Sequence, residues 1–476
     1  MYDRRRGMRR KRLLAGVLLA TTLAVGACSG SGGDGGGGGG GGSADDGTLT
    51  VWTTEDQAER VQAQQAILDE FGKQSGTTVK LVAVAEDQLT TVLTAAAAAN
   101  DLPDVIGALS LNGMNQLRTD DLVDGKAAAE VVDKLGRDTF QQRALELTSA
   151  DGEQIAVPSD GFAQLLFYRK DLFKAAGLSE PTTYADVQKA AEQLHKGKTA
   201  GIVAGTAPAD SFTQQAFEQV ALANGCQLVN DAGDVTLNST QCQESFAYYA
   251  DLIKNTSVKG NQDADTTRAT YFAGDAAMVI WSSFLLDELA GLRKDALPTC
   301  DECKGDPSWL AENTGIVTTL QGPSGAGPAA YGEIVSWNVL KDASPKAKDL
   351  VTYMMSDGYL KWLAISPEGK VPTRTGTTEN PQQYADAWGK LETGVDKKAL
   401  LSDVYSPETL KMIAESPDSF QRWGLPQGQG ELAGAVAGQF VVPKALAGMI
   451  NSGTSAADAT AKAQKEAEQI KSDLGG

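Results

Sequence analysis

An alternation of strand and helix patterns near the start of the foldable part of the chain restricts the fold more than any other feature. The order is strand, helix, strand, helix, strand, which indicates a parallel, doubly wound α/β sheet. Each strand pattern is a short apolar run, and each helix pattern repeats apolar residues at helical spacing. Gly72 and Gly76 are expected to end the first helix. The strands cover residues 48–52, 79–84 and 102–106, and the helices cover residues 55–71 and 88–99.

Residues 151–183 allow two different arrangements of the chain. A short apolar strand ends at Pro158, and a second apolar strand covers residues 165–168 after a corner at residues 160–162. The two strands either form a hairpin or carry the chain from one lobe into a second lobe. A helix over residues 170–176 follows, and Gly177 is placed to end it.

The rest of the chain continues to mix helix and strand patterns. Thr183 or Thr182 is the predicted N-cap for the first of these helices. Predicted helices cover residues 184–196, 211–224, 241–254, 266–272, 345–355, 431–449 and 456–470, and predicted strands cover residues 201–204, 235–237, 315–320 and 331–339.

Several short motifs carry a family resemblance. Residues 168–173 read YRKDLF, residues 272–280 read FAGDAAMVI, and residues 370–374 read KVPTR. These motifs are similar to those of family 1 of the extracellular solute-binding proteins, the group of maltose-binding protein. Arg169 stands where that family usually has Asn, and Phe284 takes the place of its Trp. The resemblance extends over nearly all of residues 48–470.

The resemblance implies a two-lobed periplasmic-binding-protein fold of the α/β class. Each lobe would be a mostly parallel, doubly wound sheet flanked by helices, and several crossing strands would form the hinge. The predicted first lobe comprises residues 48–159 and 331–370, and the second comprises residues 160–330 and 371–476.

The N-terminus indicates export and a lipid anchor. Seven Lys and Arg residues precede an apolar run at residues 13–25, and small residues lead to Cys28. Residues 1–27 are therefore predicted to be a lipoprotein signal peptide, with Cys28 as the lipidated residue; an ordinary signal peptide is the alternative. Arg9 and Arg10 leave the choice between general secretion and twin-arginine export open. Residues 28–47 form a glycine-rich tether with a reach of roughly 24 Å.

The charge balance excludes several classes of protein. Without residues 1–27, the chain has 35 Lys and Arg against 60 Asp and Glu. Such an acidic surface argues against nucleic acid and anionic lipid as partners, so the membrane contact is expected only through the anchor. His195 is the one histidine, which excludes a His-based triad. No cofactor or metal motif is present, and acidic pairs such as Asp120-Asp121 are expected by chance.

Four cysteines follow Cys28, and an even count in an exported chain favours disulfides. Locality favours Cys226 with Cys242 and Cys300 with Cys303. A redox dithiol or half of a zinc site remains the alternative for Cys300 and Cys303.

Aromatic and polar side chains at the expected rim of the sheet fit a sugar site. Flat rings cover the apolar face of a pyranose, and carboxylates and amides bind its hydroxyls. Trp52 also fits a buried strand residue, and Arg374 also fits a residue that fixes the hinge. The candidate ligand-binding residues are Trp52, Glu55, Asp56, Ser110, Asn112, Asp160, Phe162, Trp281, Ser282, Phe284, Glu333, Arg374, Trp423, Gln427 and Gln429.

These observations and the resemblance together predict a monomeric, lipid-anchored binding protein on the outer face of the cell membrane. It would capture a mono- or oligosaccharide between its lobes and deliver it to the permease subunits of an ABC importer. The first alternative is the same fold binding a glycerophosphodiester or a polyol. The second is a secreted carbohydrate-active enzyme.

Overall fold

The structure is a computed structural model that describes residues 47–475. The predicted signal peptide, Cys28 and the tether up to Asp46 lie outside the described residues and stay predictions. No single helix among residues 47–475 is both long and apolar enough to cross a membrane. One bent pair of helices, Gly430–Gly438 with Val441–Ser452, meets those criteria only when its two members are taken together.

The centre of the fold is a mixed β-sheet whose strands come from distant parts of the chain. In chain order, its strands are β1 (Thr48–Thr53), β2 (Thr78–Ala83), β3 (Val105–Leu109), β6 (Val157–Arg169), β7 (Met278–Ser282), β8 (Thr314–Val317), β9 (Ala330–Val339), β10 (Val371–Pro372) and β13 (Phe420–Gln421).

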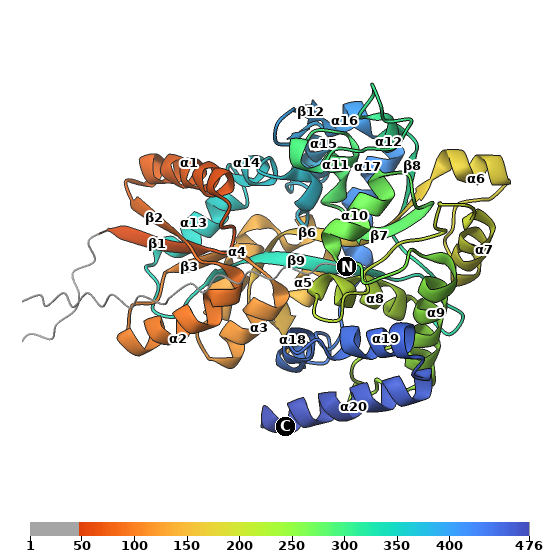
Figure 1. The fold of residues 1–476 in the computed structure, drawn as a ribbon. Coiled ribbons are helices and arrows are strands. Elements are labelled where there is room, and N and C mark those ends of the chain that lie inside the picture. Colours follow the sequence, from red (N-terminus) through yellow and green to blue (C-terminus); the bar gives the residue numbers. More distant parts are fainter. Residues whose placement is uncertain (1–46, 476) are drawn as a thin grey trace, which may run out of the picture. The chain divides into compact units, whose positions relative to one another are not determined.

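The strand order along the sheet is β10-β6-β9-β3-β1-β2, with β7 and β8 on β6 and β13 on β9 (Figure 1). β1 is parallel to both β2 and β3, as the alternating pattern predicts. β9 is antiparallel to β3 and β6, and β7, β8 and β10 are antiparallel to β6. Beyond β3, the pairing is therefore more mixed than the mostly parallel sheets that the sequence predicts.

Helices cover both faces of these strands (Figure 1). They are α1 (Ala58–Ser75), α2 (Leu89–Ala99), α3 (Leu111–Thr119), α4 (Gly125–Leu135), α5 (Gln142–Leu147), α6 (Lys170–Ala176), α7 (Tyr184–Leu194), α8 (Ser211–Ala223), α9 (Thr240–Thr256), α10 (Ala264–Phe272), α11 (Leu285–Leu289), α12 (Trp309–Glu312), α13 (Lys346–Met354), α14 (Tyr359–Leu363), α15 (Gln383–Trp388), α16 (Leu401–Val404), α17 (Pro407–Glu415), α18 (Gly430–Gly438), α19 (Val441–Ser452) and α20 (Ala456–Asp473).

The first helix ends at only one of the two predicted glycines. Gly76 has a φ of 65° and its N–H bonds to the Gly72 carbonyl, which is a left-handed helix end. Gly72 instead lies inside α1, so the prediction that it ends the helix is wrong. A Cβ at Gly72 would lie 2.6 Å from the Thr77 carbonyl oxygen. The glycine is needed there because the chain passes close by on its way into β2.

β6 is one continuous strand, so the hairpin alternative at residues 151–183 is wrong. Its first half pairs with β9 and β10, and its second half pairs with β7 and β8. Pro158 does not end the strand; the register against β9 shifts between Pro158 and Asp160, which accommodates a residue without an N–H. Gly161 lets the strands approach closely, because a Cβ there would lie 2.7 Å from the Glu333 carbonyl oxygen.

Two short predicted strands exist only as single bridges. Residues 201–204 contribute Val203, which bridges Val279 of β7, and residues 235–237 contribute Val235, which bridges Val229. The caps nearby are confirmed. The Thr183 side chain accepts a hydrogen bond from Asp186 N at the start of α7, and Gly177 ends α6 with a φ of 66°.

Buried apolar residues form two clusters. The first surrounds β1 and β3 and includes the paired rings of Trp337 and Trp362, 5.0 Å apart. The second surrounds α8 and α9 and includes Phe217 and Phe246, 4.5 Å apart. Residues 371–420 were predicted to belong to the second lobe, but their buried apolar side chains are part of the first cluster. The predicted lobe boundaries do not coincide with these clusters and stay a prediction.

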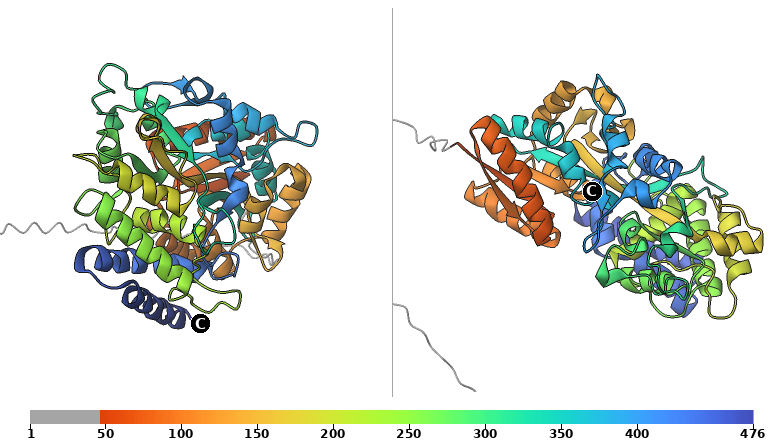
Figure 2. Two further views of the ribbon diagram at one scale, coloured as in Figure 1. Left: turned by 90° about the vertical axis from the view of Figure 1, so that its right-hand side faces the viewer. Right: turned by 90° about the horizontal axis from the view of Figure 1, so that it is seen from above.

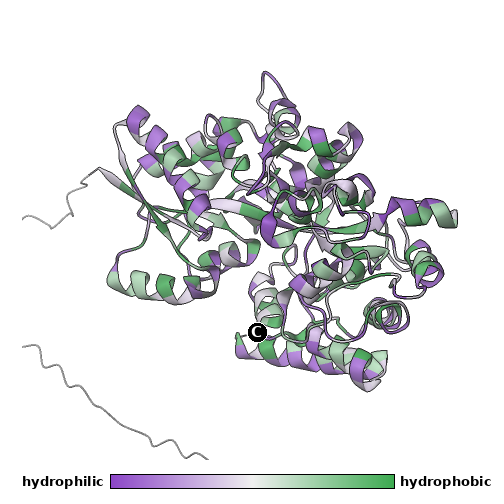
Figure 3. Cartoon of the chain, turned by 45° about the horizontal axis from the view of Figure 1, so that its top comes forward, coloured by the Kyte–Doolittle hydropathy of each residue, from purple (hydrophilic) through white to green (hydrophobic). Residues whose placement is uncertain are grey.

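The C-terminal helices pack against the second cluster. α20 lies along the outside beside α9 and α19 (Figures 1 and 2), and hydrophilic and hydrophobic residues alternate along it (Figure 3). The single helix predicted for residues 431–449 is wrong, because the chain breaks at Phe440 with a φ of 55°. Pro443 explains the break: inside a continuous helix it would clash with the preceding turn, but it fits the first turn of α19.

The cysteine pairing agrees with the sequence prediction. Cys226 is bonded to Cys242, with the Cα atoms 4.5 Å apart, and Cys300 is bonded to Cys303, with the Cα atoms 5.0 Å apart. The first disulfide joins the end of α8 to the start of α9 within the second cluster.

Candidate ligand-binding cavity

A cavity of about 800 Å³ lies where the end of β3 meets the first turns of α3 and α8. Ser110 and Asn112 line it from the β3–α3 connection, and Asp210 and Ser211 line it from the start of α8. We refer to it as the α3–α8 cavity. Its position at the carboxyl end of a parallel strand is where open α/β sheets bind ligands.

Hydrogen bonds and small residues fix the wall formed by α3. The Ser110 side chain caps α3 by accepting a hydrogen bond from Gly113 N at 3.4 Å. Leu111 N donates to Glu333 Oε1 of β9 at 2.8 Å. α18 packs closely against α3, because a Cβ at Gly430 would lie 2.6 Å from Cγ of Asn115. These contacts hold the polar residues of the α3–α8 cavity in place from three elements.

A buried group of charges forms part of the cavity wall. Arg422 Nη1 donates to Glu333 Oε2, Arg422 Nε lies 3.8 Å from Glu218 Oε1, and the guanidinium lies 4.8 Å from the ring centre of Tyr331. Burial disfavours the charged guanidinium, but Glu333, Tyr331 and Glu218 raise the pKa of Arg422 above its ordinary value. Burial raises the pKa of Glu218, although Arg422 and the donating Trp423 N–H oppose it.

Other acceptors in the wall have no cation beside them. Glu86 is exposed as a whole residue, yet its carboxyl lies in a concave part of the wall. Desolvation raises the pKa of Glu86 most, and the negative charge of Glu333 raises it further. Gln214 is 6% exposed. Its Oε1 has no partner, and neither does Oδ1 of Asn112. Both oxygens are buried away from the cavity, whose wall is instead rich in carboxyl groups from Glu86, Asp210, Glu218 and Glu333.

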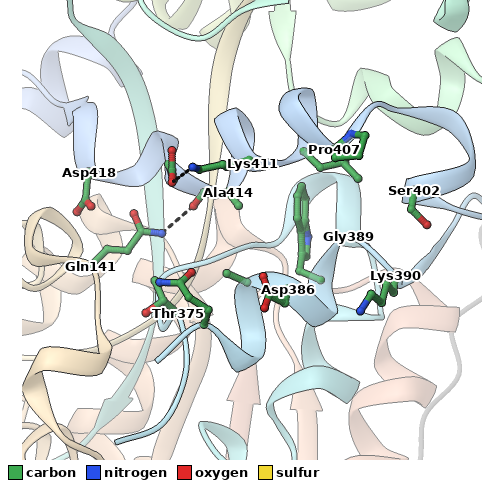
Figure 4. A pocket seen from close by; sticks show the side chains of 15 residues that line it. Gln141, Thr375, Asp386, Gly389, Lys390, Ser402, Pro407, Lys411, Ala414 and Asp418 are labelled. Atoms are coloured by element: carbon green, nitrogen blue, oxygen red, sulfur yellow. Dashed lines mark hydrogen bonds and ion pairs between the residues drawn. The ribbon is translucent and has the colours of Figure 1, made fainter. Parts of the chain in front are cut away.

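A second cavity, of about 930 Å³, lies between α15 and α17 (Figure 4). The Gln141 side chain crosses toward α17 and donates from Nε2 to the Ala414 carbonyl at 2.9 Å and to the Pro372 carbonyl at 2.8 Å. None of the predicted ligand-binding residues lines this cavity. We therefore assign the candidate site to the smaller α3–α8 cavity, which lies at the end of a parallel strand.

No group of three or more His, Cys, Asp or Glu side chains among residues 47–475 is arranged to hold a metal ion.

Comparison with known proteins assigns the family. Residues 53–361 match the family model described as "Bacterial extracellular solute-binding protein". The chain is a member of this family.

Two kinds of relative resemble this solute-binding protein. In sequence, it is 28% identical over 393 residues to the "Putative ABC transporter periplasmic-binding protein YcjN" of Escherichia coli (strain K12), covering 79% of this chain and 84% of that protein. In structure, it resembles the GacH receptor of Streptomyces glaucescens GLA.O, at 18% identity and a TM-score of 0.65, covering 89% and 98% of the two chains.

Two further structures have the same fold. The cyclic α-maltosyl-1,6-maltose binding protein of Arthrobacter globiformis has 18% identity and a TM-score of 0.66, covering 89% of this chain and 98% of that one. An ABC transporter solute-binding protein of Agrobacterium radiobacter K84, in complex with ribitol, has 20% identity and a TM-score of 0.61, covering 90% and 99%. This likeness confirms the predicted two-lobed α/β fold of the solute-binding protein.

Four of the predicted ligand residues line the α3–α8 cavity of this solute-binding protein: Ser110, Asn112, Glu333 and Trp423. Trp423 is nevertheless only 2% exposed, and its Nε1 donates to the Cys226 carbonyl at 2.8 Å. Its ring therefore supports the wall, and little of it is available to a ligand.

A second set of predicted residues gathers around Lys370 instead. Glu55 Oε1 lies 2.6 Å and Asp160 Oδ2 lies 3.5 Å from Lys370 Nζ, and Glu55 also accepts from Arg60 at 2.9 Å. Burial acts against ionisation of Glu55, but Lys370 and Arg60 prevail and lower its pKa to about 2. Trp362 Nε1 donates to Asp160 at 2.6 Å. The two carboxylates are thus committed to buried ion pairs and do not line the α3–α8 cavity.

Phe162 and Phe284 form a half-buried aromatic pair with ring centres 5.5 Å apart, and the Arg60 guanidinium lies 5.7 Å from the Phe284 ring. The structure brings these two predicted residues together, as expected for a platform. They are not among the residues that line the α3–α8 cavity. Their contact with a ligand stays a prediction.

The remaining predicted residues have other surroundings. Trp52 is 8% exposed and belongs to the first apolar cluster, and Arg374 is 3% exposed and donates to the Leu135 carbonyl at 2.9 Å. Both positions agree with the structural alternatives that the sequence left open. The others also lie outside the α3–α8 cavity: Asp56 is exposed, Trp281 donates to the Ala264 carbonyl, Ser282 pairs with Gln164, Gln427 donates to Asp231, and Gln429 N donates to the Gly424 carbonyl.

Five residues that line the cavity were not predicted from the sequence: Glu86, Asp210, Gln214, Glu218 and Arg422. Asp210 and Gln214 carried a usable signal, because they follow the predicted strand at residues 201–204 as Ser110 follows β3. Open α/β sheets bind ligands beyond the carboxyl ends of their strands. Applying this rule to the second half of the chain as well would have identified Asp210 and Gln214 as candidates. Glu218 and Arg422 carried no such signal, since their pairing depends on tertiary contacts.

Proposed function

We propose that this protein is an exported lipoprotein that captures a sugar or polyol in the α3–α8 cavity and delivers it to the permease of an ABC importer. The observation that carries the proposal is a cavity lined by carboxyl, amide and hydroxyl side chains at the end of β3 in a member of a solute-binding family. Carboxylates and amides of this kind bind hydroxyl groups. In addition, the names of the structural relatives mention acarbose, ribitol and laminaribiose.

The proposal assigns further roles to residues named above. Phe284, supported by Phe162, does not line the α3–α8 cavity, and closure of the lobes would have to bring its half-buried ring over the apolar face of the sugar. Closure of two lobes about the crossing strands would trap the ligand, and the closed form would dock on the permease. Cys28 would hold the monomer on the outer face of the cell membrane, and residues 28–47 would supply the tether. The protein would bind its solute without turnover.

A thermal-shift screen against sugars and polyols tests the proposal. Saturating ligand stabilises a folded protein by about 2.7 kcal/mol at a concentration a hundred times Kd, which raises the melting temperature measurably. We expect at least one sugar or polyol to shift the melting temperature, with saturation. A form of the protein that begins after Cys28 is used so that lipid does not interfere. A panel without any saturable shift would contradict the proposal, and conversion of a bound sugar into a product would favour an enzyme.

A further inference from the structure

Two buried carboxyl groups meet where α11 packs on the short 3-10 helix η4 (Pro367–Gly369). Asp287 of α11 is 1% exposed, and Glu368 of η4 is 5% exposed. Neither carboxyl oxygen of Asp287 has a hydrogen-bond partner among residues 47–475. A buried carboxylate without a partner costs so much free energy that such a group keeps its proton instead.

The two carboxyl groups have different surroundings. Glu368 accepts hydrogen bonds from the hydroxyl groups of Ser366 and Thr393, and Arg60 donates in turn to the Ser366 hydroxyl at 3.1 Å. Hydrogen bonds of this kind favour the ionised form of a carboxyl group. Asp287 has no such donors, so it is the member of the pair that carries a proton.

Two arginines lie near α11, but both are paired with other carboxylates. Arg268 of α10 pairs with Glu288 at 3.1 Å, and Arg293, which follows α11, pairs with Asp295 at 3.0 Å. Neither guanidinium is therefore available to hold Asp287 in its charged form.

The other titratable groups beside α11 supply no positive charge. Burial raises the pKa of Tyr405, which stays neutral, and its hydroxyl donates to the Leu286 carbonyl at 2.6 Å. Glu312 of α12, which packs beside α11, is exposed. An ionised Asp287 would thus lie beside the carboxylate of Glu368 without compensation.

The pKa of Asp287 agrees with this geometry. Burial raises it most, and the charges of Glu368 and Glu288 raise it further, to about 8. The charge of Arg293 and a weak contribution from the Glu288 N–H act in the opposite direction.

The contact between α11 and η4 also holds the Phe284 ring. Phe284 is the N-cap of α11, and its ring covers Gly369, where a Cβ would lie 1.8 Å from Phe284 Cε1. The chain leaves η4 at Lys370, whose buried ion pairs with Glu55 and Asp160 fix the next segment. A separation of α11 from η4 would therefore move the Phe284 ring.

We propose that Asp287 and Glu368 form a proton-controlled latch: α11 packs on η4 only while Asp287 carries its proton, and separation of the two elements releases that proton to water. Two carboxylates at this buried contact would repel each other strongly. A rise in pH therefore favours separation and frees the Phe284 ring. The latch consists of buried groups of the fold and does not depend on the proposed function.

Hydrogen exchange of the whole protein, followed by mass spectrometry and corrected for the intrinsic effect of pH, tests the latch. When one proton leaves on opening, the opening constant rises by up to about tenfold per pH unit below the pKa of the packed state. We expect exchange in residues 284–292 to accelerate at least about tenfold between about pH 5 and about pH 8, and to level off above. Exchange in α4 should stay unchanged. A corrected rate for residues 284–292 that does not rise would overturn the proposal.

Three variants assign the effect to the latch. Asp287→Asn keeps the size of the side chain and has no proton to lose, so the acceleration should disappear. Glu368→Gln removes the repelling charge, so the levelling off should move to a lower pH. Asp251→Asn, an exposed residue of α9, is the matched control and should behave as the wild type. An acceleration that persists in Asp287→Asn, or a profile unchanged in Glu368→Gln, would overturn the proposal.

Infrared spectroscopy detects the proton itself. At about pH 7, ordinary carboxyl groups are ionised, so the difference between the wild type and Asp287→Asn should contain the carbonyl band of one protonated carboxylic acid. A difference spectrum without that band would show that Asp287 is ionised and would overturn the latch.

Discussion

The buried charges around Arg422 make a strong prediction about stability. Arg422, Glu218 and Glu333 are all less than 10% exposed, and the arginine lies between the two carboxylates. Replacing it with methionine keeps most of the apolar volume but leaves two buried carboxylates without a cation. The change therefore separates the role of the charge from that of packing.

The expected loss is large because the carboxylates stay buried. Breaking a buried ion pair by removing one partner costs about 3–5 kcal/mol, whereas breaking an exposed pair costs at most about 1 kcal/mol. A typical protein has a free energy of unfolding of about 5–15 kcal/mol. Arg422→Met should therefore lose about 3–5 kcal/mol at neutral pH.

The loss should depend on pH in a definite direction. Burial already raises the pKa of Glu218, and loss of Arg422 raises it further. A carboxyl group whose pKa is higher in the folded state destabilises the fold as pH rises through that value. The difference between the wild type and Arg422→Met should thus be greatest near neutral pH. It should shrink as acid protonates Glu218 in the variant.

Urea unfolding followed by tryptophan fluorescence, at neutral and at mildly acidic pH, measures both effects. Arg137→Met is the matched control, because Arg137 forms a surface pair with Asp133 at 3.1 Å and is 45% exposed. Combining Arg422→Met with Glu218→Gln and Glu333→Gln should recover much of the lost stability. A loss below about 1 kcal/mol, or one that does not change with pH, would refute the assignment of a buried, charge-balancing role to Arg422.

Three further predictions use other parts of the chain. Cys28→Ser should move the protein from the membrane fraction into the soluble fraction, and a variant that stays with the membrane would contradict the lipid anchor. Lys370→Met should raise the pKa of Glu55 from about 2 toward its ordinary value. In the wild type, ionised Glu55 contributes stability that is present above about pH 4.5 and is lost as pH falls toward 2. In Lys370→Met, this contribution should be lost at a higher pH, and acid unfolding measures the difference. Phe284→Ala should weaken sugar affinity about tenfold by calorimetry, and unchanged affinity would place the Phe284 ring outside the site.

The local patterns of the sequence predict much of the fold. Apolar runs identify β1, β2, β3 and β9, and residues such as Thr183, Gly177 and Gly76 mark the helix ends that the structure has. These signals succeed because capping and left-handed helix ends are determined by neighbouring residues.

The errors arise where distant residues decide the local structure. Proline interrupts many strands. At Pro158, however, the register between β6 and β9 shifts, and β6 continues. Gly72 resembles a helix end, yet its role is to make room for the Thr77 carbonyl. In both cases, the deciding contact comes from another element, which a pattern of neighbouring residues does not contain.

The candidate site was predicted only in part for the same reason. Ser110 and Asn112 follow β3 directly, so the rule for strand ends finds them. Arg422 lies after a short strand near the C-terminus, and only the folded chain brings it between Glu218 and Glu333. Trp52 and Arg374 have the residue types of a sugar site, but burial gives both a structural role.

The long strand β6 affects the order in which the parts of the chain can fold. β6 extends over 13 residues, or roughly 43 Å, and its first half pairs with β9, which also pairs with β3. Because β9 comes only at residues 330–339, β3 and β6 keep exposed edges until that distant segment has joined the sheet. An N-terminal fragment that stops before residue 330 should therefore aggregate or stay unfolded, and should need the remaining segment supplied in trans to become soluble.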